Sequence, residues 1–320
     1  MIIVPGKESI LVKGSDKLAF SVTACLLLGG YSVTLFTEVK QNAVDRLKIH
    51  KEDLQSTFSD NLNLNNLTIV DQLDSGSDYS LAIVQTSENS AEKRSAVMEL
   101  EQKLGNDIVI AINTESIDIS DLQAGAINPN RIIGANWVEP AHATSFLEII
   151  YSGDINKAYA DKFCDLSRTR LRKDPYLVAN SGIRARLMGA LFREAGHLIQ
   201  HGYATIEDID RACRNDAGYY LPFAGNFRYM DLMGTSAYGT VMKNLNPELA
   251  KDSSVPDCLK EVFEKGGLGM QNSEGFYNYK VGDAENWDTT FRKFSYEIQD
   301  IMSKYPFGHD TGNLAEDKID

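Results

Sequence analysis

Short runs rich in aliphatic and β-branched residues alternate with helical patterns over the first 180 residues, and this alternation most constrains the fold. The segment ESILV at 8–12 is predicted as a first strand. An apolar helix is predicted at 17–30, ending at the pair Gly29-Gly30, and SVTLF at 32–36 is predicted as the second strand. Strands that alternate with helices form βαβ units, whose crossovers are nearly always right-handed. The pattern therefore predicts a doubly wound parallel sheet.

The same alternation continues to residue 179. Further strands are predicted at 67–70, 81–84, 107–112, 132–138, 146–151 and 176–179, and further helices at 39–54, 90–104 and 155–171. Together these elements predict the fold class α/β, with a Rossmann-like doubly wound domain over residues 1–180.

After Ser181 the pattern becomes almost entirely helical. Apolar residues recur every three or four positions over 183–198, which predicts one apolar face of a long helix. Thr205 followed by Asp208 is typical of a capping box, and the helix that it opens is expected to run to about Arg214.

Three more helices and a tail complete the chain. The helices are predicted at 229–245, 256–266 and 287–305, and the polar tail at 309–320 is expected to be frayed. The chain is thus expected to divide into the domain 1–180, an all-helical domain at 181–283, and an extra C-terminal helix with a polar tail at 284–320.

Composition excludes several classes of partner. The formal net charge of −13 argues against a nucleic-acid partner, because phosphate backbones are bound mainly by Lys and Arg. No apolar run reaches the roughly 18 residues that suggest a membrane span, and the N-terminus MIIVPGKES does not resemble a secretory signal. The four cysteines are scattered without a CxxC pair, which predicts reduced thiols. These observations predict a cytoplasmic protein with no membrane partner.

Several segments share their residues and spacing with one enzyme family. Gly134, Pro140 and Glu148 keep the family's frame in the segment RIIGANWVEPAHATSFLEII at 131–150. Later blocks read REAGHLIQHGYATIEDID at 193–210, LPFAGNFRYMDLMG at 221–234 and GGLGMQNSEGFYNY at 266–279. Over residues 8 to 280 the chain resembles the 3-hydroxyacyl-CoA dehydrogenases, in which these blocks occur in the same order.

The resemblance implies an NAD-dependent oxidoreductase of fatty acid metabolism that acts on a 3-hydroxyacyl-CoA such as 3-hydroxybutyryl-CoA. NAD is the implied cofactor, and an acyl-CoA is the implied small-molecule substrate. The all-helical second domain is of the kind that forms a homodimer in this family. The similar blocks in that domain indicate fold and assembly rather than catalysis.

The turn between the first strand and the first helix is where this fold binds its cofactor. Dinucleotide sites place Gly-x-Gly-x-x-Gly at this turn. Here Val12, Gly14 and Lys17 occupy the three positions, so only the middle glycine is kept and a β-branched side chain is expected at the turn. Two interpretations are open. Lys17 and the helix N-terminus could hold a phosphate, or Asp16 could repel a phosphate and cap the helix instead.

The ribose position is altered as well. An acidic residue is expected at the end of the second strand, and Thr37 stands there with Glu38 next. Asn113 matches the Asn of an Asn-Thr pair in the family. The candidate cofactor-binding residues are therefore Gly14, Ser15, Lys17, Glu38 and Asn113.

The resemblance also places the catalytic positions of the family on this chain. In the family a His takes the proton from the 3-hydroxyl as hydride leaves for NAD, a Glu orients that His, and a Ser and an Asn hold the substrate oxygen. Here Asn136 replaces the His, Glu115 replaces the Ser, and Glu148 keeps the Glu. The helix Asn falls at Ala185 or Arg186 and is absent.

Asn136 has no titratable group near neutral pH, so a general-base contribution of roughly 10²–10⁴ in rate is expected to be lost. His142, six residues further on, is one alternative base. Glu115 is another, because an apolar cleft can raise the pKa of a carboxyl group. Glu148 has no His to orient and is expected to be retained for structure. Its expected cationic partner is Arg186 or Arg184.

Two weaker patterns have structural interpretations. Glu194, His197 and His201 have the spacing of metal ligands on a helix, but no second carboxylate-rich helix accompanies them, so no metal is expected. The basic run RTRLRK at 168–173 could meet the phosphates of a CoA-like ligand, or it could be a solvated helix end.

Three functions therefore remain open. The chain is a working NAD-dependent 3-hydroxyacyl-CoA dehydrogenase with altered site chemistry, a catalytically inactive member (a pseudoenzyme) that binds an acyl-CoA or another metabolite, or a structural partner subunit. The losses at the His, Ser, Asn and glycine positions all fall in one cleft, which favours the second or third function for the chemistry itself.

Overall fold

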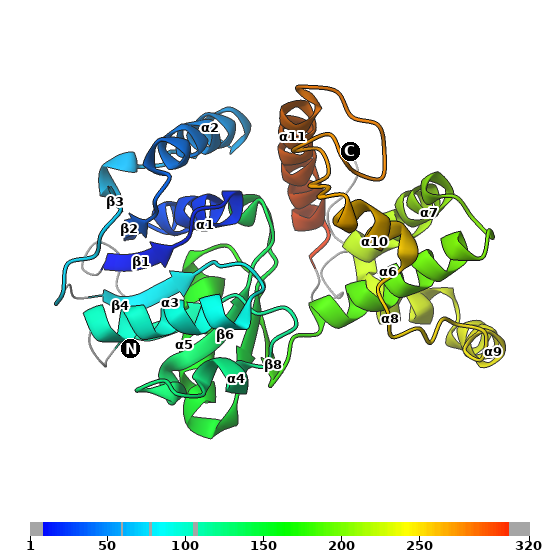
Figure 1. The fold of residues 1–320 in the computed structure, drawn as a ribbon, viewed down its shortest axis with the longest axis horizontal. Helices are drawn as coiled ribbons and strands as arrows, with labels where there is room; N and C mark the ends of the chain where they lie inside the picture. The colour runs from blue at the N-terminus through cyan, green and yellow to red at the C-terminus, as the bar shows by residue number, and fades with distance from the viewer. Residues whose placement is uncertain (1–8, 59, 77–78, 105–107, 307–320) are drawn as a thin grey trace, which may run out of the picture. The chain divides into compact units, whose positions relative to one another are not determined.

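The computed structural model describes residues 9–58, 60–76, 79–104 and 108–306. The chain forms two compact units that divide between Leu187 and Met188 (Figure 1). The first unit is a layered α/β domain and the second is helical, which confirms the predicted fold class. The predicted domain boundaries at residues 180 and 283 stay a prediction.

Within the described ranges, eight strands of the first unit form one sheet in the order β3-β2-β1-β4-β5-β6-β7-β8. The strands are β1 (Ser9–Lys13), β2 (Ser32–Phe36), β3 (Leu67–Val70), β4 (Tyr79–Val84), β5 (Val109–Ile112), β6 (Ile132–Asn136), β7 (Glu148–Tyr151) and β8 (Tyr176–Ala179). The order of the first six strands is that of a dinucleotide-binding Rossmann sheet. The sequence prediction of a doubly wound sheet is therefore confirmed.

The sheet is not parallel throughout, contrary to expectation. Strand β7 runs antiparallel to β6, and β8 runs parallel to β7. The segment 137–147 that connects β6 and β7 contains only a short 3-10 turn. A parallel crossover generally needs a dozen or more residues, usually including a helix, to return the chain to the other end of the sheet. The short connection therefore reverses the strand direction.

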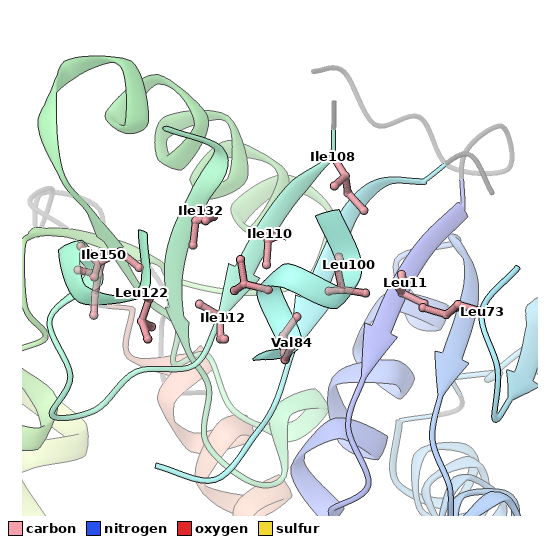
Figure 2. Packing of buried hydrophobic residues seen from close by; sticks show 14 residues of the cluster. Leu11, Leu73, Val84, Leu100, Ile108, Ile110, Ile112, Leu122, Ile132 and Ile150 are labelled. Atoms are coloured by element: carbon pink, nitrogen blue, oxygen red, sulfur yellow. The ribbon is translucent and has the colours of Figure 1, made fainter. Parts of the chain in front are cut away.

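Helices cover the sheet and bury its central strands. They are α1 (Lys17–Leu28), α2 (Lys40–Phe58), α3 (Ser90–Leu104), α4 (Ile119–Gln123) and α5 (Gly153–Arg170), with 3-10 turns η1 (Leu64–Asn66), η2 (Pro129–Arg131) and η3 (Ala141–Ala143). Figure 2 shows one core cluster, in which Leu100 of α3 and Leu122 of α4 pack with strand residues such as Ile110 and Ile132. Every residue of β5 is buried, as expected for a strand covered on both faces.

The second unit consists of helices, and α6 continues into it from the first. They are α6 (Arg184–Gln200), α7 (Ile206–Ala212), the π-helical turn η4 (Cys213–Ala217), α8 (Gly218–Met233), α9 (Thr235–Leu245), α10 (Asp257–Glu264) and α11 (Asp283–Lys304). The single helix predicted at 229–245 is wrong, because Gly234 separates α8 from α9 with a φ of 109°. Glycine adopts this backbone region without a Cβ clash, so it breaks the helix there.

Two other predictions for this unit are confirmed. Thr205 and Asp208 form the capping box at the start of α7. The extra C-terminal helix exists as α11 and contacts α8, where the ring of Tyr305 lies 6.2 Å from that of Phe223. The predicted frayed tail at 309–320 lies outside the described residues. In the part of the chain that the structure describes, no helix has the length and apolar character needed to cross a membrane.

Candidate active site

The candidate site follows one edge of the sheet. Strands β1 to β6 end at this edge, where Gly14 and Gln85 come after β1 and β4, and Asn136 closes β6. Because β7 and β8 run in the opposite direction, their first residues, Glu148 and Tyr176, lie at the same edge. The strand register pairs Asn136 with Glu148, and Glu148 with Tyr176. Side chains at paired positions share a face of the sheet, so three polar side chains form one row.

Glu148 is the buried acidic centre of this row. Its side chain is fully buried, and its Oε1 accepts a hydrogen bond from Nδ2 of Asn136 at 2.9 Å. Its Oε2 accepts hydrogen bonds from the Tyr176 hydroxyl at 3.1 Å and from the main-chain N–H groups of Ile183 and Arg184 at 2.7 and 3.1 Å. These N–H groups lie at the start of α6, where the helix dipole favours a negative charge. Donors from three elements therefore stabilise the buried carboxylate.

The glycine before α6 makes this arrangement possible. A Cβ on Gly182 would lie 2.2 Å from Oε1 of Glu148 and 3.4 Å from Nδ2 of Asn136. Any larger residue would push the carboxylate away from its donors. The close approach of the chain at Gly182 is therefore part of how the site is built.

Asn136 bridges two parts of the site. It is 1% exposed, and its Oδ1 accepts a hydrogen bond from the main-chain N–H of Thr114 at 2.7 Å. Its Nδ2 donates to the carbonyl oxygen of Thr114 at 2.7 Å as well as to Glu148. Both ends of the amide are thus engaged, and the group has no titratable proton. Asn136 holds the loop after β5 against Glu148 and has no capacity to act as a base.

Glu115 and Arg184 form an ion pair beside this row. Nη1 of Arg184 lies 2.7 Å from Oε1 of Glu115, and each side chain is about one third exposed, at 36% and 31%. The guanidinium also lies 5.9 Å from the centre of the Phe146 ring. The expectation that an arginine side chain pairs with Glu148 is wrong for Arg184, which gives Glu148 only its main-chain N–H. The charge of Arg184 instead engages Glu115, the predicted alternative base.

Tyr176 is a site residue that sequence reasoning missed. It is half-buried, and its ring packs edge-on against Phe146 with centroids 5.9 Å apart. Burial, and next the charge of Glu148, raise the pKa of the Tyr176 phenol above its ordinary value, while Arg184 opposes this rise. A tyrosine at the start of a strand carries no signal of its own. Only the register between β7 and β8 places it against Glu148.

The raised pKa of Tyr176 predicts how stability changes at high pH. Above about pH 10, the ordinary pKa of tyrosine, the folded chain keeps a proton that the unfolded chain loses. The stability that this group contributes is therefore complete below that pH and is lost as the pH rises through the folded-state pKa. In urea unfolding, the stability difference between wild type and Tyr176→Phe should shrink above about pH 10. A difference that stays constant into this range would contradict the prediction.

His142 is placed in a different environment. It is buried in the turn η3, and its ring centre lies 4.2 Å from that of His50 in α2. The structure therefore places this candidate base in an interior ring pair, and a catalytic role for it stays a prediction.

Gly14 occupies the tight turn between β1 and α1. A Cβ at this position would lie 2.7 Å from the Cβ of Ala19 and 3.0 Å from the carbonyl oxygen of Gln85. The first turn of the helix and the end of β4 therefore approach the backbone where only a glycine fits. Close helix–strand packing of this kind is one of the roles that glycines have in a dinucleotide loop.

The residues next to Gly14 show where Val12 lies and how the first helix is capped. Val12 is buried inside β1, which continues to Lys13, so the expectation of a β-branched side chain at the turn is wrong. Lys17 is the exposed first residue of α1. Oδ1 of Asp16 accepts the main-chain N–H of Ala19 at 2.8 Å, which confirms the helix cap. The N-terminus of α1 thus already carries a carboxylate.

The ribose position is occupied by a pair of hydroxyl groups. Oγ of Ser15 and Oγ1 of Thr37 lie 3.0 Å apart, and Thr37 is buried. Glu38 is exposed. Hydroxyl groups both donate and accept, so this pair can hydrogen-bond a sugar hydroxyl without a carboxylate.

Gln85 is a second residue that sequence reasoning missed. It is 3% exposed and lies beside Gly14 at the end of β4, and neither Nε2 nor Oε1 has a hydrogen-bond partner among the described residues. Buried side-chain amides are rarely left in this state, so a missing partner is expected there. A dinucleotide lying along this edge would be in position to supply it. The residues present therefore fit a dinucleotide cofactor.

Asn113 ties two loops of this edge together. Its Oδ1 accepts from the main-chain N–H of Thr86 at 3.0 Å, and its Nδ2 donates to the carbonyl oxygen of Thr86 at 2.8 Å. The fully buried Lys93 donates to the carbonyl oxygen of Asn113 at 2.7 Å and lies 3.2 Å from Glu88. Burial lowers the pKa of Lys93, and Glu88 opposes this effect. Asn113 thus orders the loops, and a cofactor contact by it stays a prediction.

The two weaker motifs have structural partners. Oε2 of Glu194 accepts the main-chain N–H of Ala250 at 2.7 Å, and His197 lies 3.4 Å from Asp252. In the described part of the chain, no group of three or more His, Cys, Asp or Glu side chains is placed to hold a metal ion. In the basic run, Arg172 forms two hydrogen bonds with Asp60, at 2.5 and 3.0 Å.

A doubly wound sheet with a glycine at its first crossover is the architecture of dinucleotide-binding proteins, which hold the dinucleotide at this edge. Residues 10–181 match the family model described as 3-hydroxyacyl-CoA dehydrogenase, NAD binding domain, and residues 183–279 match that described as 3-hydroxyacyl-CoA dehydrogenase, C-terminal domain. The chain belongs to the 3-hydroxyacyl-CoA dehydrogenase family. The first match supports NAD as its cofactor. Helix α11 follows the matched region.

Relatives of known name agree with this assignment. The chain is 28% identical over 212 residues to a 5-formyl-3-hydroxy-2-methylpyridine 4-carboxylate 5-dehydrogenase of Mesorhizobium japonicum, covering 64% of this chain and 66% of that enzyme. It is 29% identical over 218 residues to a 3-hydroxybutyryl-CoA dehydrogenase of Mycobacterium tuberculosis, covering 67% and 75%. A crystal structure of the pyridine dehydrogenase, described as an NAD+-dependent dismutase, superposes with a TM-score of 0.85 at 22% identity, covering 93% of this chain and 99% of that one.

Proposed function

We propose that this chain is a working NAD-dependent oxidoreductase that interconverts a hydroxyl and a carbonyl group on a 3-hydroxyacyl-CoA. The observation that carries the proposal is the carboxylate of Glu148, buried at the same sheet edge as Gly14 and as Gln85, whose amide has no hydrogen-bond partner among the described residues. Membership of the family supports the same reaction class.

The residues proposed to hold the cofactor are those at the end of β1, β2 and β4. Gly14 allows the close approach, the hydroxyl pair of Ser15 and Thr37 would bind the ribose, and the amide of Gln85 would gain its missing partners. When bound, NAD supplies the hydride acceptor or donor. Asn136 and Glu148 position the reacting end of the site, but the family's proton transfer by a histidine is not available at Asn136.

The test is an NADH titration followed by an NADH-oxidation assay with acetoacetyl-CoA, run beside Asn136→His. Wild type should change the fluorescence of NADH on binding and should turn over acetoacetyl-CoA. No fluorescence change up to millimolar NADH would contradict cofactor binding. Binding without turnover in wild type, together with turnover in Asn136→His, would instead identify a catalytically inactive family member. A rise in melting temperature with acetoacetyl-CoA would then indicate that it binds the acyl-CoA.

A second substrate class is favoured by Arg184. Its side chain is about one third exposed beside the candidate site, and arginine recognises carboxylates through paired hydrogen bonds. The pyridine dehydrogenase of Mesorhizobium japonicum acts, by its name, on a small ring carboxylate. Faster turnover of that pyridine carboxylate than of acetoacetyl-CoA would assign this class, and Arg184→Gln should then raise its KM.

We also infer that the chain forms a homodimer through its second unit. Large apolar side chains are exposed on α6, α8 and α9, where a soluble monomer rarely keeps a large apolar patch. They include Leu191, Phe192, Phe227, Leu232, Met233 and Val241. Light scattering after gel filtration should report about twice the 35.5 kDa chain mass. A mass equal to that of one chain would contradict the dimer.

A cytoplasmic location is proposed on the state of the cysteines. The four cysteines all fall within the described ranges and are free thiols, as expected in a reducing compartment.

A further inference from the structure

Glu148 exchanges protons with its surroundings only through its neighbours, because it is fully buried. Among the described residues, its donors are the Asn136 amide, the main-chain N–H groups of Ile183 and Arg184, and the hydroxyl of Tyr176. Amides do not titrate near neutral pH. Of these four donors, the phenol of Tyr176 is therefore the one that can pass a proton to the carboxylate.

Tyr176 is the least buried residue of the row. Its side chain is half-buried, whereas those of Asn136 and Glu148 are almost or fully buried. Its single proton is donated to Oε2 of Glu148. A phenol oxygen that donates its proton keeps lone pairs that can accept from a second group. A substrate oxygen that donates to this hydroxyl would therefore be linked through it to Glu148.

We propose that Tyr176 is the catalytic residue that transfers the proton in this chain, with Glu148 as its proton acceptor. Tyr176 would thus perform the proton transfer that Asn136 does not perform. This assignment rests on the proposed function. It names the group that touches the reacting oxygen of the substrate, and it explains how a chain without the family's histidine can keep the family's reaction.

The proton step balances as follows for oxidation of a hydroxyl group. The substrate O–H bond breaks and its proton bonds to the Tyr176 oxygen, while the original phenol proton passes to Oε2 of Glu148. The carbon becomes a carbonyl as its hydrogen leaves as hydride for the oxidised nicotinamide. In the reverse direction Tyr176 donates its proton to the new alkoxide and regains one from Glu148. Tyr176 is unchanged after either direction.

Charged groups lie close to the phenol. Glu148 faces it directly, and the ion pair of Arg184 with Glu115 lies nearby. Burial, and next the charge of Glu148, raise the pKa of Tyr176, while Arg184 opposes this rise. The ring of Phe146 packs edge-on against that of Tyr176.

The first experiment compares Tyr176→Phe with Tyr159→Phe, a matched loss of one phenol oxygen on α5 away from the site. With NADH and acetoacetyl-CoA, Tyr176→Phe should lower kcat by roughly 10²–10⁴-fold, the usual contribution of a proton-transfer group. The dissociation constant for NADH should change less than about threefold, because the phenol is assigned to the proton and not to the cofactor. Tyr159→Phe should keep the kcat of wild type.

The second experiment needs no turnover. The protein is labelled with tyrosine carrying ¹³C at the ring carbon bonded to oxygen, and the Tyr176 signal is assigned by its absence in Tyr176→Phe. Acetoacetyl-CoA is added to the protein in the presence of NAD+. The resulting complex cannot react, because acetoacetyl-CoA and NAD+ are both in their oxidised forms. The Tyr176 signal should shift as its hydroxyl contacts the carbonyl group, and the Tyr159 signal should not.

The outcomes separate this assignment from the proposed function. Turnover in wild type with equal kcat in Tyr176→Phe overturns the role of Tyr176 and leaves the proposed function standing. A Tyr176 shift without turnover supports the contact and contradicts the proposed activity on this substrate. Neither shift nor turnover, with NADH bound, overturns both.

Discussion

Glu148→Ala is expected to lower the free energy of unfolding of the first unit by about 3–5 kcal/mol, as when one partner of a buried charged pair is removed. The substitution leaves the N–H groups of Ile183 and Arg184, the Tyr176 hydroxyl and the Asn136 amide without their acceptor. Each buried donor left unsatisfied costs about 1–3 kcal/mol. Water entering the space will satisfy some of them, so the total is less than the sum. Urea unfolding followed by tryptophan fluorescence measures the loss.

Two variants control for other effects of the change. Glu38→Ala removes an exposed carboxylate of the same unit and should change stability by less than about 0.5 kcal/mol. Glu148→Gln keeps the shape of the side chain, but its amide has a donor in place of one acceptor oxygen. This variant should therefore lose less stability than Glu148→Ala. If Glu148→Ala unfolds at the same urea concentration as Glu38→Ala, the hydrogen bonds to this carboxylate do not stabilise the fold.

Gly14→Ala is expected to weaken both the fold and the binding of NADH. The new Cβ would lie 2.7 Å from the Cβ of Ala19 and 3.0 Å from the carbonyl oxygen of Gln85. Overpacking of this kind costs about 1–3 kcal/mol. Relief of the clash moves α1 or the end of β4, which are the elements proposed to hold the dinucleotide. The dissociation constant for NADH should rise at least about tenfold, the equivalent of about 1.4 kcal/mol.

The matched control is Gly189→Ala in α6. A Cβ there meets nothing within 4 Å, and alanine favours a helix over glycine by about 1 kcal/mol. This variant should keep the NADH affinity of wild type and unfold at an equal or higher urea concentration. Equal NADH affinity in Gly14→Ala would show that the cofactor does not approach the chain at this turn.

Local patterns predicted most of the first unit. The bounds of β2, β3, β8 and α3 agree with the sequence prediction residue for residue. These elements are set by short-range features, namely apolar spacing and the turn residues that flank them. The short helix α4 was missed, because a helix of one turn or so has too few residues to show a period.

The second unit was predicted less well, and backbone geometry explains the error. The aromatic and apolar residues at 229–245 continue a helical spacing across Gly234, so the pattern predicts one helix. The φ of 109° at Gly234 divides it into α8 and α9, and Gly225 adds a kink inside α8 with a φ of 64°. Glycine permits this conformation but does not require it, so its presence alone does not locate the break.

The sequence by itself determined the family, the doubly wound sheet and the positions of Asn136 and Glu148, because these follow from residues close together in the chain. The tertiary structure alone decided that Asn136 is a bonded bridge, that Arg184 pairs with Glu115, and that Tyr176 donates to Glu148. The physical reason is the register of β6, β7 and β8. It aligns residues that are distant in sequence, and the reversal at β7 brings the start of two strands to the edge where the others end.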